Sequence, residues 1–211
     1  MKPSPLPVAV IGGTGKAGTY LIRHLLDQGF EVRALYRNPT QAISHPLLRP
    51  IQGDASRYES ISTLLEGCGA VISTLGSRKG EPVILSQATE HIIRAMNQLG
   101  LKRYIVVTGL SIDVPADRKR LKTRLLSRLM RWSFPKVIAD KQREFQLLSE
   151  STLDWTVVRV PQLELSEELY PVRVSVEDCL GDKLSTTALA HFLVQQLSNL
   201  SLIHQAPFVS N

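Results

Sequence analysis

The chain has 211 residues, of which 43% are hydrophobic and 21% are charged, and this composition predicts one globular domain and excludes a disordered or fibrous protein. Its two cysteines, Cys68 and Cys179, lie far apart in the sequence, which argues against a disulfide framework and a clustered zinc site and favours a reducing cytoplasm. The formal net charge of +6 is local, because residues 118–136 hold eight basic and no acidic side chains, and the rest of the chain is slightly acidic.

Short β-rich runs alternate along the chain with longer segments of helical period. Strands are predicted at residues 8–11, 31–36, 50–52, 70–74, 103–108 and 155–160, with a further one at 172–176. Helices are predicted where apolar residues recur at spacings of three and four, at residues 20–28, 60–65, 82–99, 138–150 and 187–197. With right-handed crossovers, this order predicts a doubly wound parallel sheet of the Rossmann type. We therefore expect a single α/β domain over residues 1–211, with substrate-side insertions at 110–135 and 161–182.

A glycine-rich turn follows the first predicted strand. Gly12, Gly15 and Gly18 have the spacing G-x-x-G-x-x-G, directly after "VAVI" and directly before the first predicted helix. Such a turn lets the backbone approach a pyrophosphate, while free N–H groups and the helix dipole favour its negative charge. The three glycines alone are also compatible with a purely structural turn. Their position between strand and helix favours dinucleotide binding.

Arg37 lies at the end of the second predicted strand, in "ALYRNP". An NAD-preferring site places an acidic residue about here, roughly 20 residues after the glycines, to accept the ribose hydroxyls. A guanidinium can instead pair with a 2′-phosphate, so Arg37 predicts a preference for NADP(H). The alternative is a solvated surface arginine.

Several stretches resemble one family. "VIGGTGKAG", "VRALYRNP", "IQGDASRYESISTLLEGCGAVISTLG", "KRYIVVTGL" and "STLDWTVVRVPQL" together resemble the atypical short-chain dehydrogenase/reductase family, in its NAD(P)H-binding, NmrA-like and biliverdin-reductase-B-like branch. The resemblance covers nearly the whole chain. It implies the fold and the cofactor but not the substrate.

The resemblance implies a set of cofactor-binding residues. Those at the pyrophosphate would be Gly12, Thr14, Gly15, Lys16 and Ala17. Those along the rest of the cofactor would be Arg37 at the adenosine phosphate, Asp54 beside the adenine, Ser73, Thr74, Leu75 and Gly76 along the ribose, Thr108 with Gly109 facing the nicotinamide, and Pro161 with Gln162 at the far end. For Asp54 a helix cap is a competing interpretation, because a short polar side chain in a turn can satisfy free N–H groups.

The chain departs from the family pattern at the catalytic tyrosine. Relatives carry Tyr-x-x-x-Lys on the helix after the fifth strand, whereas "VIADKQREF" places Val137 where the tyrosine should be, four residues before Lys141. A valine cannot transfer a proton. The resemblance leaves Lys141, at the nicotinamide ribose, and Thr108, near the family's catalytic serine, as the catalytic candidates. Lys141 could equally be a solvated cation, and Thr108 a strand-end residue that bonds its own backbone.

Without the tyrosine, reduction of a simple ketone is not expected. Flavins, quinones and similar conjugated acceptors delocalise the incoming charge and can take their proton from solvent, so the protein mainly positions donor and acceptor. The prediction is therefore an NADPH-dependent reductase of a conjugated small molecule. The alternative is a non-catalytic NADP-binding redox sensor, resembling the NmrA-like regulators, for which the missing tyrosine is expected.

Residues 118–136, hereafter the basic segment, have an amphipathic pattern. A helix would align Leu121, Leu125, Leu129 and Trp132, hereafter the apolar stripe, widened by Leu126 and Met130. We expect a lid whose apolar side covers the cofactor cleft while its charges face water. The alternatives are a surface for an acidic partner, a site on anionic lipid, or steering of an anionic substrate.

Other ligands and partners are not indicated. The five histidines are scattered without metal-ligand spacing, and no recognition motif for nucleic acid accompanies the basic segment. No apolar run is long enough to span a membrane, and prolines interrupt the apolar start of the chain, so we expect no signal peptide and a cytoplasmic location. The expected partner is a small-molecule substrate or effector.

Overall fold

The computed structural model describes residues 6–77, 80 and 83–211, and within them one sheet dominates. Its strands are β1 (Val8–Ile11), β2 (Val32–Tyr36), β3 (Leu48–Gln52), β4 (Ala70–Ser73), β5 (Arg103–Gly109), β6 (Asp154–Val160), β8 (Arg173–Ser175) and β10 (Phe208–Ser210). They lie in the order β3-β2-β1-β4-β5-β6-β10-β8, and all pairs are parallel except β10 with β8. The predicted doubly wound sheet is confirmed, with an antiparallel strand at one edge.

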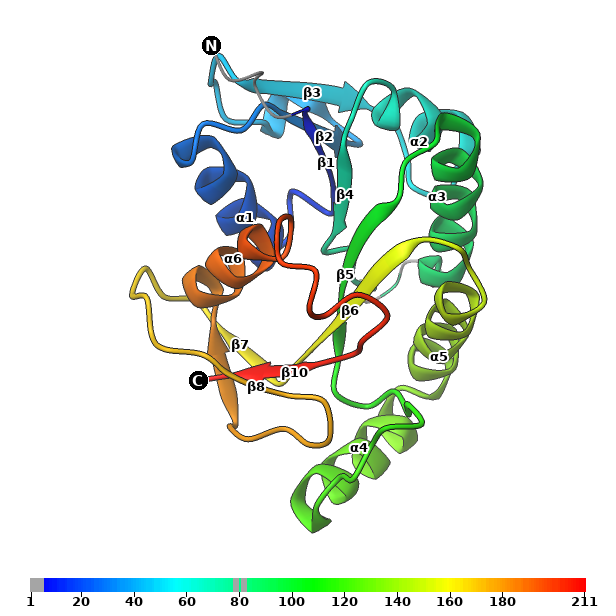
Figure 1. The fold of residues 1–211 in the computed structure, drawn as a ribbon, viewed down its shortest axis with the longest axis vertical. Helices are drawn as coiled ribbons and strands as arrows, with labels where there is room; N and C mark the ends of the chain where they lie inside the picture. The colour runs from blue at the N-terminus through cyan, green and yellow to red at the C-terminus, as the bar shows by residue number, and fades with distance from the viewer. Residues whose placement is uncertain (1–5, 78–79, 81–82) are drawn as a thin grey trace.

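Helices cover both faces of this sheet (Figure 1). They are α1 (Lys16–Asp27), α2 (Tyr58–Leu65), α3 (Leu85–Leu99), α4 (Leu121–Ser133), α5 (Pro135–Ser149) and α6 (Thr186–Gln195), with a 3₁₀ turn η1 (Pro39–Gln41). Helices α1 and α6 pack together on one face, and α2, α3 and α5 on the other. Helix α4 covers neither face and projects from the lower end of the molecule in the view of Figure 1. Among the described residues, no helix is long and apolar enough to cross a membrane.

The sequence dictates these layers through burial. All four residues of β1 are at most 2% exposed, because helices cover both faces of the central strand, and its sequence VAVI is accordingly apolar throughout. Helix α1 buries Leu21, Ile22, Leu25 and Leu26, which share one face at helical spacing. Burial of each such side chain is worth about 1.5–3 kcal/mol. Two clusters of buried apolar side chains, one on each face of the sheet, thus hold β1, β2, β4 and β5 together.

Helices α1 and α5 begin earlier in the structure than the sequence predicted. Helix α1 begins at Lys16, four residues earlier than expected, because the turn glycines lead straight into it. Helix α5 begins at Pro135, where the fixed backbone angle of proline suits a first helical turn. The expected start of the third helix, Pro82, lies outside the described residues.

Three short strands were not predicted. Strands β7 (Gln162–Glu164) and β9 (Lys183–Ser185) pair with each other in a separate parallel ribbon, and β10 joins the main sheet beside β6. Each has only three residues, too few for a hydrophobic alternation to emerge from the sequence. The expected insertion at 161–182 contains β7 and β8, and β9 follows it directly.

Candidate active site

The glycine turn packs against the loop that follows β4. Gly12 has φ +85°, and a Cβ there would lie 2.7 Å from the Thr74 carbonyl carbon. A Cβ on Gly18 would lie 2.2 Å from the Gly12 carbonyl oxygen, and the Gly15 N–H donates to that same oxygen at 3.0 Å. Only glycine fits Gly12 and Gly18, because one position has a left-handed backbone and both would clash with backbone atoms.

The glycine turn leads into the N-terminus of α1, which no side chain caps. Gly15 is the N-cap residue, no side chain caps the helix, and its first turn contains no acidic residue. Free N–H groups and the positive end of the helix dipole are therefore available to an anion. Thr14 and Lys16 are exposed here, whereas the Ala17 methyl group is buried in the core. Ala17 could therefore contribute to a phosphate site through its backbone N–H.

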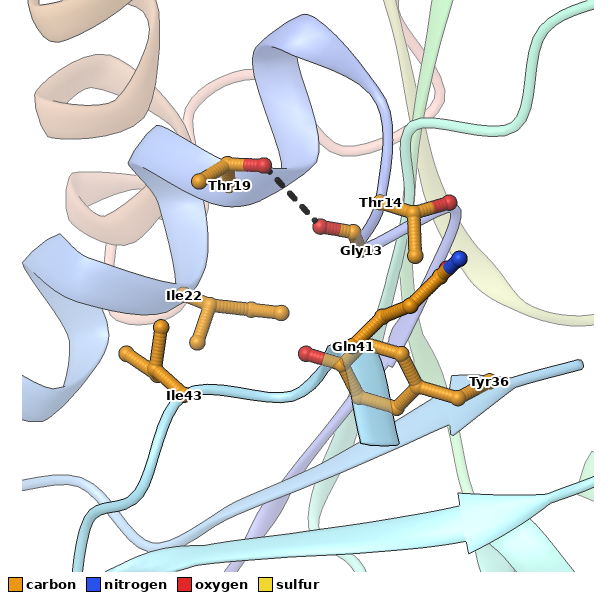
Figure 2. Close-up of a pocket in the computed structure, with 7 residues that line it drawn as sticks. All are labelled: Gly13, Thr14, Thr19, Ile22, Tyr36, Gln41 and Ile43. Atoms are coloured by element: carbon orange, nitrogen blue, oxygen red, sulfur yellow. Dashed lines mark hydrogen bonds between the residues drawn. The ribbon is translucent and has the colours of Figure 1, made fainter. Parts of the chain in front are cut away.

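A cavity of about 420 Å³ opens beside the glycine turn (Figure 2). Its walls come from the turn, from α1, from the end of β2 and from η1 with the residues after it, namely Gly13, Thr14, Thr19, Ile22, Tyr36, Gln41 and Ile43. In Figure 2 the Tyr36 ring and the Gln41 side chain lie on the side of the cavity opposite α1. Of these residues, sequence reasoning named only Thr14. The position of Gln41 and Ile43, just after Arg37, was the available signal.

Arg37 and Asp54 lie near each other at the ends of β2 and β3. Arg37 is exposed directly after β2, and its charge contributes to the lowered pKa of Asp54. The larger cause is Ser56, whose hydroxyl and N–H donate to the Asp54 carboxylate at 2.6 and 2.8 Å. Asp54 thus stabilises the turn before α2 but does not cap that helix, whose N-cap residue is Arg57. Its place beside an adenine stays a prediction.

The loop after β4 is bonded to the glycine turn. The Thr74 hydroxyl donates to the carbonyl oxygens of Ile11 and Gly12, each at 3.3 Å, and the Ser73 hydroxyl accepts from the Leu75 N–H at 3.4 Å. A Cβ on Gly76 would meet no atom of a described residue within 4 Å. The predicted ribose and pyrophosphate residues are therefore brought together at one edge of the sheet.

The predicted nicotinamide residues also meet at the carboxyl edge. Thr108 is 4% exposed, and its hydroxyl has no hydrogen-bond partner among the described residues. A bond from Thr108 to its own backbone is thus not formed. Gly109 is in register with Val160, so the half-buried Pro161 and the exposed Gln162 follow β6 close to the end of β5. A buried hydroxyl without a partner at this edge is available to a bound molecule.

Lys141 reaches the same place from α5. Its Nζ lies 3.6 Å from where a Cβ on Gly109 would be, and burial lowers its pKa. Lys141 is therefore not a fully solvated cation: its side chain is half-buried and its ammonium group lies against the end of β5. Val137 occupies the first turn of α5, one helical turn before Lys141, and brings no proton-transferring group.

Glu144 is a buried partner of Lys141 that sequence reasoning missed. It is 6% exposed, and its Oε1 accepts from the Thr89 hydroxyl at 3.0 Å. Burial raises the pKa of Glu144 to about 7, although Thr89 and Lys141 both oppose that rise. Its spacing of three from Lys141 on a helix was the available signal.

The ionisation of Glu144 predicts a pH-dependent stability. Folded Glu144 keeps its proton up to about pH 7, whereas the unfolded chain loses it near 4.5, so stability falls as pH rises between these values. Glu144→Gln removes this ionisation. Between pH 5 and pH 8, the wild type should lose about 2 kcal/mol of its free energy of unfolding relative to Glu144→Gln. Urea unfolding at both pH values measures this difference, with exposed Glu150→Gln as the control. If the free energy of unfolding changed with pH equally in Glu144→Gln and the wild type, the raised pKa of Glu144 would be contradicted.

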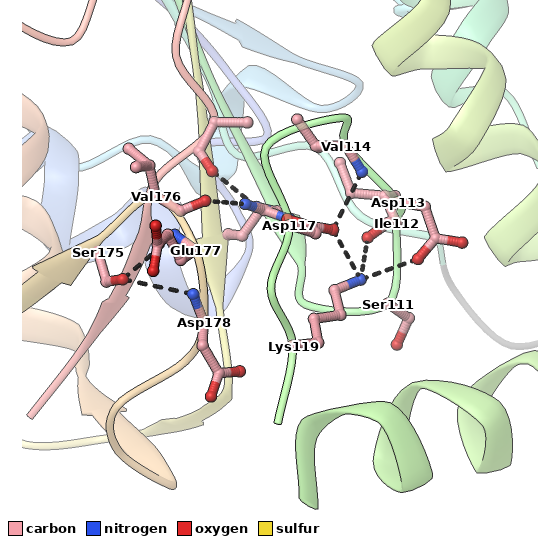
Figure 3. Close-up of polar contacts among 12 residues, drawn as sticks. Ser111, Ile112, Asp113, Val114, Asp117, Lys119, Ser175, Val176, Glu177 and Asp178 are labelled. Carbon is pink, nitrogen blue, oxygen red and sulfur yellow. Dashed lines mark hydrogen bonds and ion pairs between the residues drawn. The ribbon is translucent and has the colours of Figure 1, made fainter. Parts of the chain in front are cut away.

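A network of ion pairs holds the loop after β5 against β6 and β10 (Figure 3). The Arg159 side chain is 0% exposed; it donates to Asp117 Oδ1 at 2.5 Å and to the Ala206 carbonyl oxygen at 2.7 Å. Its guanidinium lies 3.6 Å from the centre of the Phe208 ring. Lys119 lies between Asp113 and Asp117, at 3.0 and 3.2 Å. Asp117 therefore neutralises two buried cations at the base of the basic segment.

The basic segment forms the expected helix, but with its faces reversed. The apolar stripe faces solvent, with exposed fractions of 81% for Leu121, 65% for Leu125, 54% for Leu129 and 82% for Trp132. Thr123 and Ser127 are instead the buried residues of α4. The prediction of a lid whose apolar side covers the cleft is therefore wrong. The reason is that the polar side of the helix is bonded to the body of the protein.

These features define a class of protein: a Rossmann-type domain with a glycine turn, an open helix N-terminus and a 3-2-1-4-5-6 strand order built for a dinucleotide. The chain belongs to the NAD(P)H-binding family, whose model matches residues 12–200. The resemblance to the NAD(P)H-binding branch of the atypical short-chain dehydrogenases and reductases is thereby confirmed.

The chain is similar in sequence both to proteins named as enzymes and to proteins named as assembly factors. It is 25% identical over 200 residues to photosystem II assembly factor Ycf39 from Trieres chinensis, covering 91% of this chain and 60% of that protein. It is 28% identical over 118 residues to a 3-beta-hydroxysteroid dehydrogenase from Mycolicibacterium neoaurum, covering 50% of this chain and 32% of the relative. The chain thus spans between about a third and three fifths of the length of these relatives.

Solved structures show the same fold over nearly the whole chain. ChuY, an anaerobillin reductase from Escherichia coli O157:H7, superposes with a TM-score of 0.81 at 19% identity, covering 97% of this chain and 96% of that one. A short-chain dehydrogenase/reductase from Veillonella parvula in complex with NADP superposes with a TM-score of 0.78 at 15% identity, covering 97% and 94%. At these identities the likeness establishes the fold alone.

Proposed function

We propose that this protein is an NADPH-dependent reductase of a conjugated small molecule, such as a flavin or a quinone, that works without a catalytic tyrosine. The observation that carries the proposal is that Val137 replaces the tyrosine while a half-buried Lys141 and an unpartnered Thr108 hydroxyl lie at the end of β5. This arrangement can position a nicotinamide but offers no tyrosine to donate a proton. Conjugated acceptors need only such positioning.

The residues present fit the cofactor. Gly12 and Gly18 let the turn pack tightly against its own backbone and the loop after β4, which places the uncapped N-terminus of α1 where it suits a pyrophosphate. Arg37 would pair with the 2′-phosphate beside the cavity lined by Tyr36 and Gln41. NADPH, when bound, supplies a hydride. Lys141 would hold the nicotinamide ribose, while the Thr108 hydroxyl would orient the carboxamide or the acceptor.

The names of similar proteins support this proposal unequally. ChuY is named as an anaerobillin reductase, which supports a reductase, whereas Ycf39 is named as a photosystem II assembly factor. A cytoplasmic site of action is part of the proposal, since both cysteines are free in the structure and the cytoplasm is reducing.

The proposal is tested by mixing the purified protein with NADPH and following loss of the reduced nicotinamide's absorbance. The acceptor panel contains flavins, quinones, biliverdin and simple ketones, and binding is first confirmed by nicotinamide fluorescence. Turnover of a conjugated acceptor without turnover of ketones is expected. Tight binding of NADPH with no turnover across the panel would overturn the reductase and favour a non-catalytic NADP sensor.

The preference for NADPH predicts the effect of Arg37→Ala. Loss of one charge-assisted pairing with the 2′-phosphate should weaken NADPH binding by about ten- to a hundredfold and leave NADH binding unchanged. Nicotinamide fluorescence titrations with both cofactors measure the ratio. Arg57→Ala is the matched control, because Arg57 is also exposed and also close to Asp54. An unchanged affinity ratio in Arg37→Ala would show that the phosphate assignment is wrong.

A further inference from the structure

Helix α4 is attached to the protein by its polar side. Arg131 donates to the Asp113 carboxylate and, at 3.2 Å, to the Ser111 carbonyl oxygen. Thr123 and Ser127, one helical turn apart, are buried at 6% and 3% exposure on the inward side. An amphipathic helix that only completed a soluble fold would bury its apolar side. Here the apolar stripe is presented to the outside, on a helix that projects from the body (Figure 1).

Unpaired cations border the apolar stripe. Arg124 and Arg128 follow Leu121 by three and seven residues and therefore line one edge of the stripe. Both are exposed, as is Lys136, and none of the three forms an ion pair with any residue in the described part of the chain. The surface thus combines leucines and a tryptophan with positive charges that the protein does not itself neutralise.

A small cationic cavity lies along the same edge of α4. It has a volume of about 200 Å³ and is lined by Asp113, Lys119, Arg124, Ser127, Arg128 and Arg131. Four cationic side chains face one carboxylate there. The Ser127 hydroxyl is buried and has no hydrogen-bond partner among the described residues. A cavity of this size with spare donors suits a phosphate group.

We propose that α4 docks the protein on the surface of an anionic phospholipid bilayer. The apolar stripe enters the headgroup region, Arg124 and Arg128 pair with lipid phosphates, and the cavity around Ser127 binds one of them. Leucine and tryptophan on one side of a helix, with arginine and lysine beside them, is the composition of helices that lie in a membrane interface. The attraction to anionic lipid adds to the burial of the stripe.

The charge distribution favours a bilayer over a second copy of the chain. Two copies packed through α4 would bring Arg124 and Arg128 of one copy against those of the other, and neither residue has an ion-pair partner in the described part of the chain. Such like-charge contact is unfavourable. An anionic bilayer supplies both an apolar layer for the stripe and negative charge for the cations at its edge.

The test is co-sedimentation of the full chain with vesicles of phosphatidylglycerol and phosphatidylcholine in equal amounts, compared with phosphatidylcholine alone. Binding to the anionic vesicles only, and weaker binding at high salt, is expected. Trp132 reports insertion, because its emission should shift to shorter wavelength, whereas Trp155 is already buried at 6% exposure. The variant Trp132→Phe should bind with little emission shift.

Matched variants separate the two contributions. Leu125→Gln combined with Leu129→Gln should weaken vesicle binding by about tenfold or more. Arg124→Gln combined with Arg128→Gln should weaken it by about tenfold or more as well. The controls Leu200→Gln and Arg49→Gln change an exposed leucine and an exposed arginine elsewhere, and should bind as the wild type does. All these sites are exposed, so thermal unfolding should confirm an intact fold.

Three outcomes would overturn the proposal. The first is absence of binding to anionic vesicles, or equal binding to both kinds. The second is binding of inorganic phosphate, seen by calorimetry, without binding of vesicles, which would assign the cavity to a soluble anion. The third is a dimer in sedimentation velocity that Leu125→Gln with Leu129→Gln dissociates, which would make a second copy the occupant of the stripe.

Discussion

Asp117→Asn should lower the free energy of unfolding by about 3–5 kcal/mol, the cost typical of breaking a buried ion pair from one side. The substitution keeps the shape of the side chain but removes its charge. Arg159, 0% exposed, and Lys119, 6% exposed, would then both be buried without their shared counter-charge. Burial already lowers the pKa of Arg159, and Asp117 opposes that effect. Urea unfolding monitored by circular dichroism measures the loss.

A matched control is available on the same part of the molecule. Arg118 and Glu177 form an ion pair at 3.5 Å with side chains 79% and 52% exposed, so Glu177→Gln should change stability by less than about 1 kcal/mol. Adding Arg159→Met to Asp117→Asn should restore part of the stability, because it removes one of the stranded charges. Equal effects of Asp117→Asn and Glu177→Gln would show that the buried pair is not the reason for the loss.

Gly12→Ala should abolish detectable binding of NADPH and destabilise the fold by about 3 kcal/mol or more. Two effects add at this position. The backbone is left-handed, at φ +85°, and the new Cβ would lie 2.7 to 2.8 Å from backbone atoms of Thr74 and Leu75. To relieve the contact, the glycine turn must move away from β4, which displaces the N-terminus of α1. Nicotinamide fluorescence and thermal unfolding measure the two consequences.

Gly100→Ala separates backbone strain from the clash. Gly100 ends α3 with φ +71°, similar to Gly12, but a Cβ there would meet no atom within 4 Å. We expect Gly100→Ala to cost only about 1 kcal/mol and to bind NADPH as the wild type does. If Gly12→Ala matched Gly100→Ala in both stability and binding, close packing of the turn on β4 would have no role.

The sheet and the glycine turn were predictable from the sequence because their signals are local. A strand buried on both faces must be apolar throughout, as in VAVI, and a turn that passes this close to a neighbouring strand must use glycine. The lysine at position 141 was predictable from the resemblance. The signal for each of these features lies in a few adjacent residues, so it can be read from the sequence before the tertiary contacts are known.

The orientation of α4 and the burial of Glu144 were not predictable in this way. Amphipathic spacing identifies an apolar side but not the surface that it faces, and the side of α4 facing the protein is decided by contacts to Asp113 and Ser111. Glu144 has charged neighbours in sequence and resembles a solvated residue. It is buried because α3 packs against α5 and brings Thr89 to it.

The packing of Gly12 on the loop after β4 also couples two distant parts of the sequence. The first βαβ unit, β1 to β2, contains all three turn glycines, yet the turn takes its final shape only against Thr74. β1 is in register with β2 and, on its other side, with β4, through Val8 and Ala70. This contact is distant in sequence and closes a long loop. The final shape of the turn thus depends on a contact between residues 62 positions apart in the sequence, so a change in the loop after β4 is transmitted to the N-terminus of α1.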